Sequence, residues 1–317
     1  MRVSVLGGVR IYRHAAHRIG HAIDRSVIVI AESDANDALL VRPRAQGGYG
    51  LDAVWSDDSH HAVHALFTGE QRGYYQDFGR PEQVAQALNE GFVYQGEMFK
   101  FWGKPRGTKP EGMVGEQHVF NLQNHDQVGN RAHGERLTAL IPRGARKLAA
   151  ALLLLAPETP LLFMGQEYDE KNPFLFFTSF GDPALQKAVV EGRRKEFVQF
   201  GFEDTPNPED PQTFERSKLQ WPLAGSHWSD ESQREMWEWY RRLLELRREH
   251  IVGKDRKCGA RVEADGVLTM RLGDLLVQAG LRAGTQLPAA KGEALMESDE
   301  DAYSVRVARD PQKNKTA

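Results

Sequence analysis

Residues 119–131, VFNLQNHDQVGNR, begin as an apolar strand and end in a dense group of His, Asp, Gln and Asn side chains. Two other segments share this design: VIVIAESD (27–34) places Glu32 after a β-branched run, and TPLLFMGQE (159–167) ends on Glu167. In a parallel α/β barrel the carboxyl ends of all strands open on one face, where catalytic groups from separate strands meet. The sequence therefore predicts a carboxylate site of the kind that acts on sugars, distributed over successive strands.

Strands and helices alternate from residue 27 onward, which is typical of parallel βαβ units. We expect strands at 27–32, 51–55, 118–123 and 159–165, and helices at 81–93, 143–156, 182–200 and 232–250. A closed barrel needs eight strand–helix units, so these segments predict only half of one. Because parallel strands need neighbours on both edges, we expect the chain alone to expose apolar surface and to fold poorly.

The chain after the last helix differs from the part before it, because turn residues there separate short β-rich runs. We expect a partial barrel over 27–252, a small antiparallel domain resembling a β-sandwich over 253–310, and a disordered tail over 311–317. Helical periodicity predicts two buried faces: Leu148, Leu152 and Leu155 in the 143–156 helix, and Met236, Tyr240, Leu243 and Leu244 in the 232–250 helix.

The composition excludes several classes of protein. The chain has 317 residues, 40% of them hydrophobic, which is ample for one large and one small domain, and its single cysteine, Cys258, excludes a disulfide framework. With 41 Lys and Arg against 44 Asp and Glu, the net charge of -3 gives no reason to expect nucleic acid or an anionic membrane as a partner, and favours a neutral ligand. No apolar stretch approaches the roughly 20 residues that cross a bilayer, so we expect a cytoplasmic protein.

Residues 1–26 stand apart, because Arg and His crowd together there and no acidic residue appears before Asp24. The segment lacks the apolar core and the small-residue cleavage site of a secretory signal, although an Arg-rich, acid-poor composition loosely resembles a transit peptide. We favour the interpretation that this atypical leader is not native domain sequence.

Glu32 and Asp126 are the candidate catalytic pair. Retaining glycoside hydrolysis needs a protonated carboxyl group at the leaving oxygen and a second carboxylate close to the sugar carbon. Glu32 suits the role of the acid, because desolvation at a strand end beside apolar residues raises the proton affinity of a carboxylate. Asp126 lies among the donors of the segment 124–127 and would stabilise positive charge as it develops. The alternatives are a solvated carboxylate at a helix start for Glu32 and a loop cap for Asp126.

The segment 55–64, WSDDSHHAVH, follows the second expected strand. His60 and His64 lie one helical turn apart, which invites a metal site, but neither Cys nor an H-E-x-x-H pattern accompanies them. Trp55 either stacks on a sugar ring or belongs to the core, and Glu167 either lines the site or caps a helix. Binding of sugar hydroxyl groups is the favoured role for the polar side chains of this segment: Asp57, Asp58, His60, His61 and His64.

The strand-end motifs belong to longer segments that together resemble one family. These segments are IAESDANDALLVRPRAQGGYGLDAVWSDDSHHAVHALFTGEQRGYYQDFG (30–79), FNLQNHDQVGNRAHGERL (120–137), TPLLFMGQEY (159–168), PFLFFTSFGDPAL (173–185) and EGRRKEF (191–197). In combination they resemble the malto-oligosyltrehalose trehalohydrolases, retaining glycosidases of the α-amylase superfamily. The pairing of LQNHDQVGNR with WSDDSHHAVHALFTGE is far more specific than the NHD element that the whole superfamily shares.

The resemblance implies a fold, a site and a reaction. The four strands would be the fifth to eighth of a (β/α)8 TIM barrel, with Glu32 as the proton donor and Asp126 as the transition-state stabiliser. Substrate binding would fall to residues 60–64 and to the block 125–130, which supplies His125, Gln127 and Asn130. The implied reaction is hydrolysis of the α-1,4 bond that joins the terminal trehalose of maltooligosyltrehalose to the glucan, with no metal and no organic cofactor.

The N-terminal region departs from the family pattern. The family's nucleophilic aspartate lies in an F-R-x-D-A block about one βα unit, roughly 30 residues, before the acid. Residues 1–23 contain no Asp. We interpret the chain as an N-terminally truncated copy with an out-of-frame or misassigned start, and we expect it to release no trehalose alone, because no covalent glycosyl intermediate can form.

Three alternatives stay open. Another α-amylase-class enzyme, such as an amylase or a branching enzyme, would share Glu32 and the NHD element and act on ordinary α-1,4 or α-1,6 links. A non-catalytic glucan-binding remnant would bind without turnover. A metal-dependent hydrolase would use His60, His61, His64 and Asp126, and chelators would abolish its activity.

Overall fold

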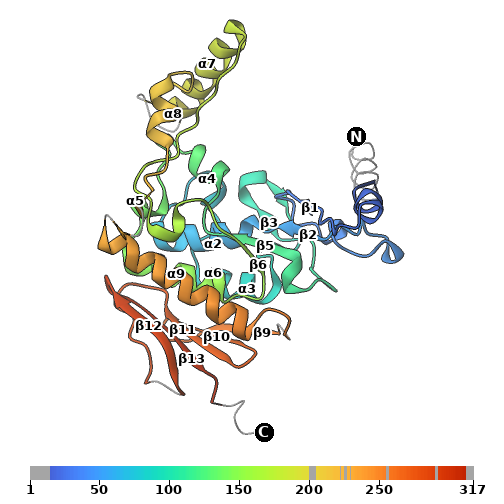
Figure 1. Ribbon diagram of the computed structural model, residues 1–317. Helices are drawn as coiled ribbons and strands as arrows, with labels where there is room; N and C mark the ends of the chain where they lie inside the picture. The colour runs from blue at the N-terminus through green and yellow to red at the C-terminus, as the bar shows by residue number, and fades with distance from the viewer. Residues whose placement is uncertain are drawn as a thin grey trace.

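The structure is a computed structural model that describes residues 15–199, 205–221, 223–224, 227–228, 230–254, 257–289 and 292–311. These residues form a parallel sheet among helices, an antiparallel sheet beyond them, and a helical arm that projects from the body (Figure 1). Of the expected leader, residues 15–22 are helical. The remaining predictions for residues 1–14 and for the tail at 312–317 lie outside the described residues.

The parallel sheet has four strands in the order β1-β2-β5-β6. They are β1 (Ile30–Ala31), β2 (Ala53–Trp55), β5 (His118–Asn121) and β6 (Thr159–Leu161). Each neighbouring pair is parallel, with Ile30 opposite Ala53, Val54 opposite His118 and Val119 opposite Thr159. The four expected strands and their parallel arrangement are therefore confirmed, although each strand is shorter than its apolar run.

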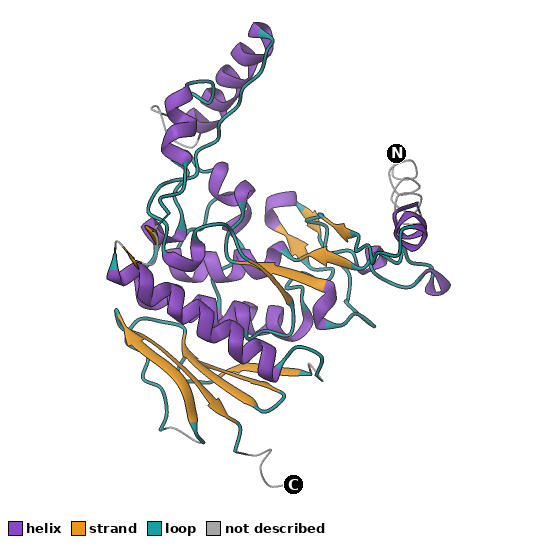
Figure 2. Ribbon diagram, in the orientation of Figure 1, coloured by secondary structure: helices purple, strands orange, loops and turns teal. Residues whose placement is uncertain are grey.

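In the described part of the chain, α-helices fill the connections from β2 to β5 and from β5 to β6, and further α-helices follow β6 (Figure 2). The α-helices are α2 (Asp57–Thr68), α3 (Pro81–Glu90), α4 (His125–Gly129), α5 (Leu137–Leu140), α6 (Arg143–Leu154), α7 (Pro183–Gln199), α8 (Pro211–Ser217) and α9 (Glu231–His250). Short 3-10 helices occupy Ala38–Leu40, Arg44–Gln46, Gly73–Tyr75, Lys100–Trp102, Gly115–Gln117 and Gln166–Tyr168. Two small hairpins complete the described connections: β3 (Met98–Phe99) with β4 (Lys104–Pro105), and β7 (Leu223–Ala224) with β8 (His227–Trp228). None of the helices in the described ranges combines the length and the apolar character that a membrane crossing needs.

A glycine ends the α3 helix earlier than the apolar pattern predicts. The α3 helix was expected to continue to residue 93, but it ends at Glu90 because Gly91 takes a positive φ of 78°. A Cβ at this position would also lie 2.4 Å from the imidazole of His118. Both observations require glycine here, and the apolar residues Phe92 and Val93 enter the core from the following loop.

The buried faces of α6 and α9 follow helical periodicity. Leu148, Leu152 and Leu155 are buried as expected. In α9 the prediction holds for Met236, Tyr240 and Leu243, but it is wrong for Leu244, which is 43% exposed. Leu246 is buried instead. It lies about one helical turn after Leu243 and shares the inner face with it, whereas Leu244, the residue next to Leu243, points away from that face toward solvent.

The C-terminal part forms one antiparallel sheet of five strands in the order β12-β13-β11-β10-β9. The strands are β9 (Cys258–Val262), β10 (Val267–Leu272), β11 (Leu275–Gly280), β12 (Ala294–Glu300) and β13 (Tyr303–Arg309). We expected a sandwich-like domain here, but in the described part of the chain the sheet packs on α3 and α6 instead of on a second sheet. Asn89 fixes this contact, because its side chain bonds both the N–H and the carbonyl of Ala260, each at 2.7 Å.

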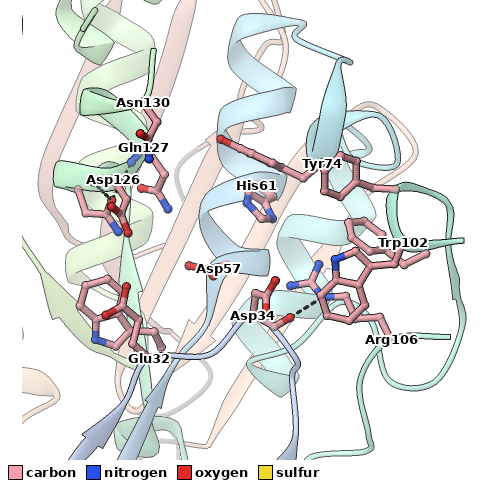
Figure 3. A pocket seen from close by; sticks show the side chains of 14 residues that line it. Glu32, Asp34, Asp57, His61, Tyr74, Trp102, Arg106, Asp126, Gln127 and Asn130 are labelled. Atoms are coloured by element: carbon pink, nitrogen blue, oxygen red, sulfur yellow. Dashed lines mark hydrogen bonds between the residues drawn. The ribbon is translucent and has the colours of Figure 1, made fainter. Parts of the chain in front are cut away.

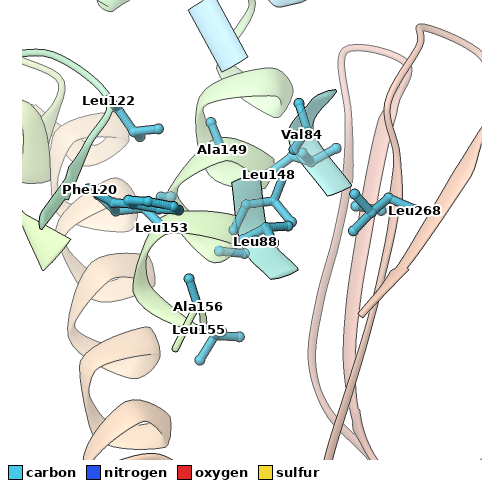
Figure 4. Packing of buried hydrophobic residues seen from close by; sticks show 14 of the residues in the cluster. Val84, Leu88, Phe120, Leu122, Leu148, Ala149, Leu153, Leu155, Ala156 and Leu268 are labelled. Carbon is cyan, nitrogen blue, oxygen red and sulfur yellow. The ribbon is translucent and has the colours of Figure 1, made fainter. Parts of the chain in front are cut away.

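A single hydrophobic core joins the helices to the C-terminal sheet (Figure 4). Leu88 of α3, Leu148 of α6 and Leu268 of β10 are at most 3% exposed and belong to the same cluster. Burial of each such side chain contributes roughly 1.5–3 kcal/mol. The cluster also reaches the parallel sheet through Phe120 of β5, and a second, smaller cluster of buried apolar residues includes Val54 of β2.

Apolar side chains are exposed at both edges of the parallel sheet. Ile28 and Ile30 at the β1 edge are 71% and 44% exposed, and Leu162 and Met164 beyond β6 are 37% and 44% exposed. Within the described residues, β1 and β6 each pair with a strand on one side only. The expected exposure of apolar surface at the sheet edges is confirmed, and poor folding of the chain alone stays a prediction.

Candidate active site

One cavity of about 270 Å³ lies at the carboxyl ends of β1, β2 and β5. Both candidate catalytic carboxylates, Glu32 and Asp126, line it (Figure 3). Figure 3 shows them on the same side of the cavity, facing Tyr74 and Trp102 on the other side, with Asp57 between. The other lining residues are Asp34, Trp55, His61, Phe99, Phe101, Arg106, Asn124, Gln127 and Asn130.

Glu32 follows β1 directly and is exposed rather than enclosed by apolar side chains. This differs from the expectation that the strand end would bury it. The cause is the position of β1 at the edge of the sheet, where Ile30 is also exposed. The carboxyl group of Glu32 is therefore accessible from the cavity.

Asp126 lies in the first turn of α4. The N-cap of this helix is Asn124, so the Asp126 side chain is not needed to cap it. The Asn124 Oδ1 accepts hydrogen bonds from the backbone N–H groups of Asp126 and Gln127, each at 3.0 Å. Because Asn124 caps the helix, the Asp126 carboxylate stays available, and its side chain is 54% exposed. His125 is exposed beside it, with Nε2 at 3.5 Å from Asp126 Oδ1, but it is not among the residues that line the cavity.

Asp57 and Asp58 are adjacent in sequence but lie in opposite environments. Burial raises the pKa of Asp57 to about 6; Arg106 acts against this, and the carboxylates of Asp34, Asp58 and Glu32 add to it. Asp57 therefore faces the cavity with a carboxyl group that gains a proton just below neutral pH.

Asp58, by contrast, is fully buried behind the cavity wall. Its Oδ2 accepts hydrogen bonds from Asn36 Nδ2 at 2.6 Å and from the N–H groups of Val93 and Tyr94 at 2.8 Å each. Its Oδ1 pairs with Arg106 Nη2 at 2.9 Å. We expected Asp58 to bind substrate, but the structure directs its carboxylate to these protein groups instead.

The three histidines of α2 also separate into two groups. His61 lines the cavity, and burial lowers its pKa well below the usual value, so it is neutral at pH 7. His60 lies behind it, with Nδ1 at 2.7 Å from the Leu122 carbonyl oxygen and Nε2 at 2.8 Å from the Tyr75 hydroxyl. His64 lies 2.8 Å from Glu70 through Nε2. His60 and His64 were expected to bind substrate, but the structure does not place them in the cavity.

The hydrogen-bond partners of these histidines also test the alternative of a metal-dependent hydrolase. In that alternative, one metal ion would be coordinated by His60, His61, His64 and Asp126. The ring nitrogens of His60 and the Nε2 of His64 face protein partners, so these side chains do not converge with Asp126. Within the part of the chain that the structure describes, no three His, Cys, Asp or Glu side chains form a group that could hold a metal ion.

Glu167 lies in the 3-10 helix Gln166–Tyr168 after β6 and does not line the cavity. Trp55, Gln127 and Asn130 do line it, and their role in substrate binding stays a prediction. Of the twelve candidate site residues, the structure thus brings seven together: Glu32, Trp55, Asp57, His61, Asp126, Gln127 and Asn130.

Sequence reasoning missed the far wall of the cavity. Phe99, Phe101, Trp102 and Arg106 come from the β3–β4 hairpin and its flanks, and Tyr74 from the 3-10 helix Gly73–Tyr75 after α2. The aromatic run FKFW at 99–102 was a signal that could have indicated a sugar-stacking surface. Asp34 and Asn124, two further lining residues, adjoin the predicted catalytic pair in sequence and could have been included with it.

No motif in the sequence points to Arg106, yet its contacts hold the aromatic wall of the cavity together. It is 2% exposed, and its Nε donates to the Asp34 carbonyl oxygen at 2.7 Å. Its guanidinium lies over the ring of Phe99 at 4.7 Å and over that of Trp102 at 5.3 Å. Arg106 therefore ties the loop that follows Glu32 to the aromatic hairpin across the cavity.

Comparison with known proteins identifies close relatives of this chain. No family model matches it. It is 41% identical over 237 residues to the malto-oligosyltrehalose trehalohydrolase of Saccharolobus solfataricus, a match that covers 75% of this chain and 39% of the relative. It is 34% identical over 291 residues to the malto-oligosyltrehalose trehalohydrolase of Mycobacterium tuberculosis, covering 89% of this chain and 50% of the relative.

A solved structure extends the comparison to the fold. The crystal structure of a putative alpha amylase from Salmonella typhimurium is 38% identical, with a TM-score of 0.78, and the match covers 92% of this chain and 53% of that one. The chain thus spans about two-fifths to one-half of the length of the curated relatives. Its parallel strands form part of an α-amylase-type TIM barrel, and over its matched residues the chain belongs to the malto-oligosyltrehalose trehalohydrolase family.

Proposed function

We propose that the cavity is the donor and stabiliser side of a retaining α-glucan hydrolase site. Its substrate would be maltooligosyltrehalose, and its product free trehalose. The observation that carries this proposal is the meeting of Glu32 and Asp126 in one cavity, although they come from different strand ends. The names of the relatives supply the substrate.

In this proposal Glu32 is the acid and Asp126 the stabiliser. The Glu32 carboxyl proton passes to the glycosidic oxygen as the bond from that oxygen to the anomeric carbon breaks. The positive charge that develops on the sugar is stabilised by the Asp126 carboxylate, which Asn124 holds in place through the start of α4.

The remaining cavity surface supports a sugar ligand. Tyr74, Phe101 and Trp102 offer aromatic faces on which pyranose rings can stack. The side chains of Glu32, Asp126 and Asn130 are exposed and line the cavity, so they can form hydrogen bonds with the hydroxyl groups of a sugar.

We further propose that this chain does not supply the nucleophile of the family. Two other carboxylates line the cavity, Asp34 and Asp57. Asp34 lies on the same loop as the acid, and the raised pKa of Asp57, about 6, disfavours the charged form that a nucleophile needs. The 317-residue chain would then bind the glucan without forming a glycosyl intermediate.

The test is product analysis with maltotriosyltrehalose, using the chain and its Glu32→Gln variant. We expect no trehalose above the level of the variant, together with measurable binding of the substrate by calorimetry. Trehalose release that Glu32→Gln abolishes would support the substrate assignment but overturn the statement about the nucleophile. Absence of binding would overturn the proposed site itself.

A second candidate is an ordinary α-amylase activity, which the name of the Salmonella typhimurium relative favours. The same assay distinguishes it when maltopentaose replaces the trehalose-capped substrate. Release of glucose or maltose, sensitive to Glu32→Gln, would favour this candidate over the trehalose-releasing one.

A further inference from the structure

The arm formed by α7, α8 and their connections leaves the body beside α4 (Figure 1). Its α7 helix contains the segment EGRRKEF (191–197), which the cavity does not use directly. One side chain of this segment nevertheless reaches the helix that carries Asp126. Arg193 Nη1 donates to Asn130 Oδ1 at 2.9 Å, and its Nη2 donates to the Gly129 carbonyl oxygen at 3.1 Å.

The guanidinium of Arg193 is itself held in a fixed position. It lies over the ring of Phe176 at 4.1 Å and over the ring of Phe197 at 4.7 Å. Phe197, on the same helix, is only 6% exposed. A guanidinium between two aromatic faces loses little further freedom when it forms hydrogen bonds, so Arg193 is prepared to bind the end of α4.

The hydrogen bond from Arg193 determines which end of the Asn130 amide can face the cavity. Asn130 is the C-cap residue of α4 and lines the cavity with Asp126 and Gln127. A guanidinium can only donate, so the atom of the Asn130 amide that faces Arg193 must be Oδ1. The Nδ2 group is then the part of this side chain that can donate to a ligand acceptor, such as a sugar hydroxyl oxygen.

We propose that Arg193 is a positioning residue of the glucan site, acting from the arm through Asn130. It fixes the amide orientation of Asn130 and secures the carbonyl end of the short helix that carries Asp126. This inference rests on the proposed function, because it assigns the ligand of Asn130 to the same glucan.

The experiment compares three variants of the full chain: Arg193→Gln, Asn130→Ala and the double variant. Arg194→Gln is the matched control, because it removes the same charge from an exposed position next along the same helix. Binding of maltotriosyltrehalose is measured by calorimetry. We expect Arg193→Gln to weaken binding about three- to tenfold, less than the loss of a direct charge-assisted hydrogen bond because Arg193 reaches the ligand only through Asn130, and Arg194→Gln to leave binding unchanged.

The double variant separates positioning from a general effect on stability. If Arg193 acts mainly through Asn130, the loss of binding in the double variant is smaller than the product of the two single losses, and any loss beyond that of Asn130→Ala comes from the contact with the Gly129 carbonyl. If the two effects multiply, or if Arg193→Gln binds as tightly as the unaltered chain, the proposal is wrong.

A measurement without ligand keeps the inference separate from the proposed function. Hydrogen exchange of the amides in residues 125–131 should become faster in Arg193→Gln than in Arg194→Gln, because the end of α4 loses its anchor. If the unaltered chain binds no maltotriosyltrehalose, the proposed function fails, whereas unchanged exchange over 125–131 would refute the role of Arg193 itself.

Discussion

The cavity and the interior behind it are built from the same segments, but they use polar groups in opposite ways. In the interior, Asp58 meets Arg106, Asn36 and two backbone N–H groups, and His60 has a protein partner at each ring nitrogen. At the cavity, the side chain of Asp126 is 54% exposed and His61 Nδ1 is buried with no hydrogen-bond partner among the described residues. In this region, polar groups behind the cavity wall bond to the protein and hold the fold, whereas the exposed carboxylate of Asp126 keeps the capacity to meet a ligand.

Removal of Asp58 should have the largest effect on stability. Asp58→Ala leaves the Arg106 guanidinium buried without its counterion, which we expect to lower the free energy of unfolding by about 3–5 kcal/mol. Urea unfolding, at protein concentrations low enough to avoid association, measures the change. A loss below about 1 kcal/mol would show that Asp58 is not the structural anion that the interior requires.

Truncation in the shared core comes next. Leu148→Ala should cost about 2–5 kcal/mol, because Leu148 is 0% exposed between α3, α6 and the C-terminal sheet. Leu244→Ala, which removes the same atoms from a side chain that is 43% exposed, is the control and should change stability by less than about 0.5 kcal/mol. Equal effects of the two substitutions would contradict the assignment of the core.

Removal of Asp57 should stabilise the fold, whereas removal of Asp58 should destabilise it, although burial raises the pKa of both carboxyl groups. Its pKa is about 6 in the folded chain against a usual value of 3.8, so the folded state holds this proton more tightly than the unfolded state. Its contribution to stability therefore falls as the pH rises from about 4 to 6 and stays unfavourable above that range. Asp57→Asn removes this penalty, and at pH 7 we expect a gain of about 1–3 kcal/mol.

The pH dependence provides the check on Asp57. Unfolding in urea at several pH values between 4 and 7 should give a smaller decline with rising pH for Asp57→Asn than for the unaltered chain. Parallel curves for the two proteins would mean that Asp57 does not titrate as described.

The exposed sheet edges give the smallest expected change in stability but a clear change in association. We expect the unaltered chain to self-associate through the apolar side chains beside β1 and β6. Ile30→Lys combined with Met164→Lys should increase the monomeric fraction in light scattering, since both side chains are 44% exposed. A sharp, reversible thermal transition from a monomer in the unaltered chain would contradict the expected poor folding.

Periodicity and strand ends were sufficient to predict the elements that carry the site. The four parallel strands follow from apolar runs that end in polar residues, and the same reasoning predicted Glu32 and Asp126, which both line the cavity. Strand-end position works as a signal because parallel strands bring their carboxyl ends to one face, whichever residues lie between them.

The residues of α2 that face the cavity could not be predicted in this way. Asp57 and His61 are four residues apart and share the cavity face of α2, whereas His60 and His64 share the face behind it. Sequence alone could pair these residues but could not decide which pair faces the ligand, because that depends on distant partners such as Tyr75 and Glu70. Arg106 was missed for the same reason: its role depends on Asp58 and Asp34, which lie far away in sequence.

The central claim is that the cavity containing Glu32 and Asp126 is a glucan site. The most direct test is whether the removal of one aromatic side chain from the cavity wall weakens the binding of maltopentaose. Phe101, which lines the cavity and is 49% exposed, is replaced by Ala, and Trp221, which is 75% exposed outside the cavity, is replaced by Ala as the control. Calorimetry should show binding by the unaltered chain and by Trp221→Ala, and binding about tenfold weaker for Phe101→Ala. Equal binding by all three proteins, or no binding by any of them, would contradict the account.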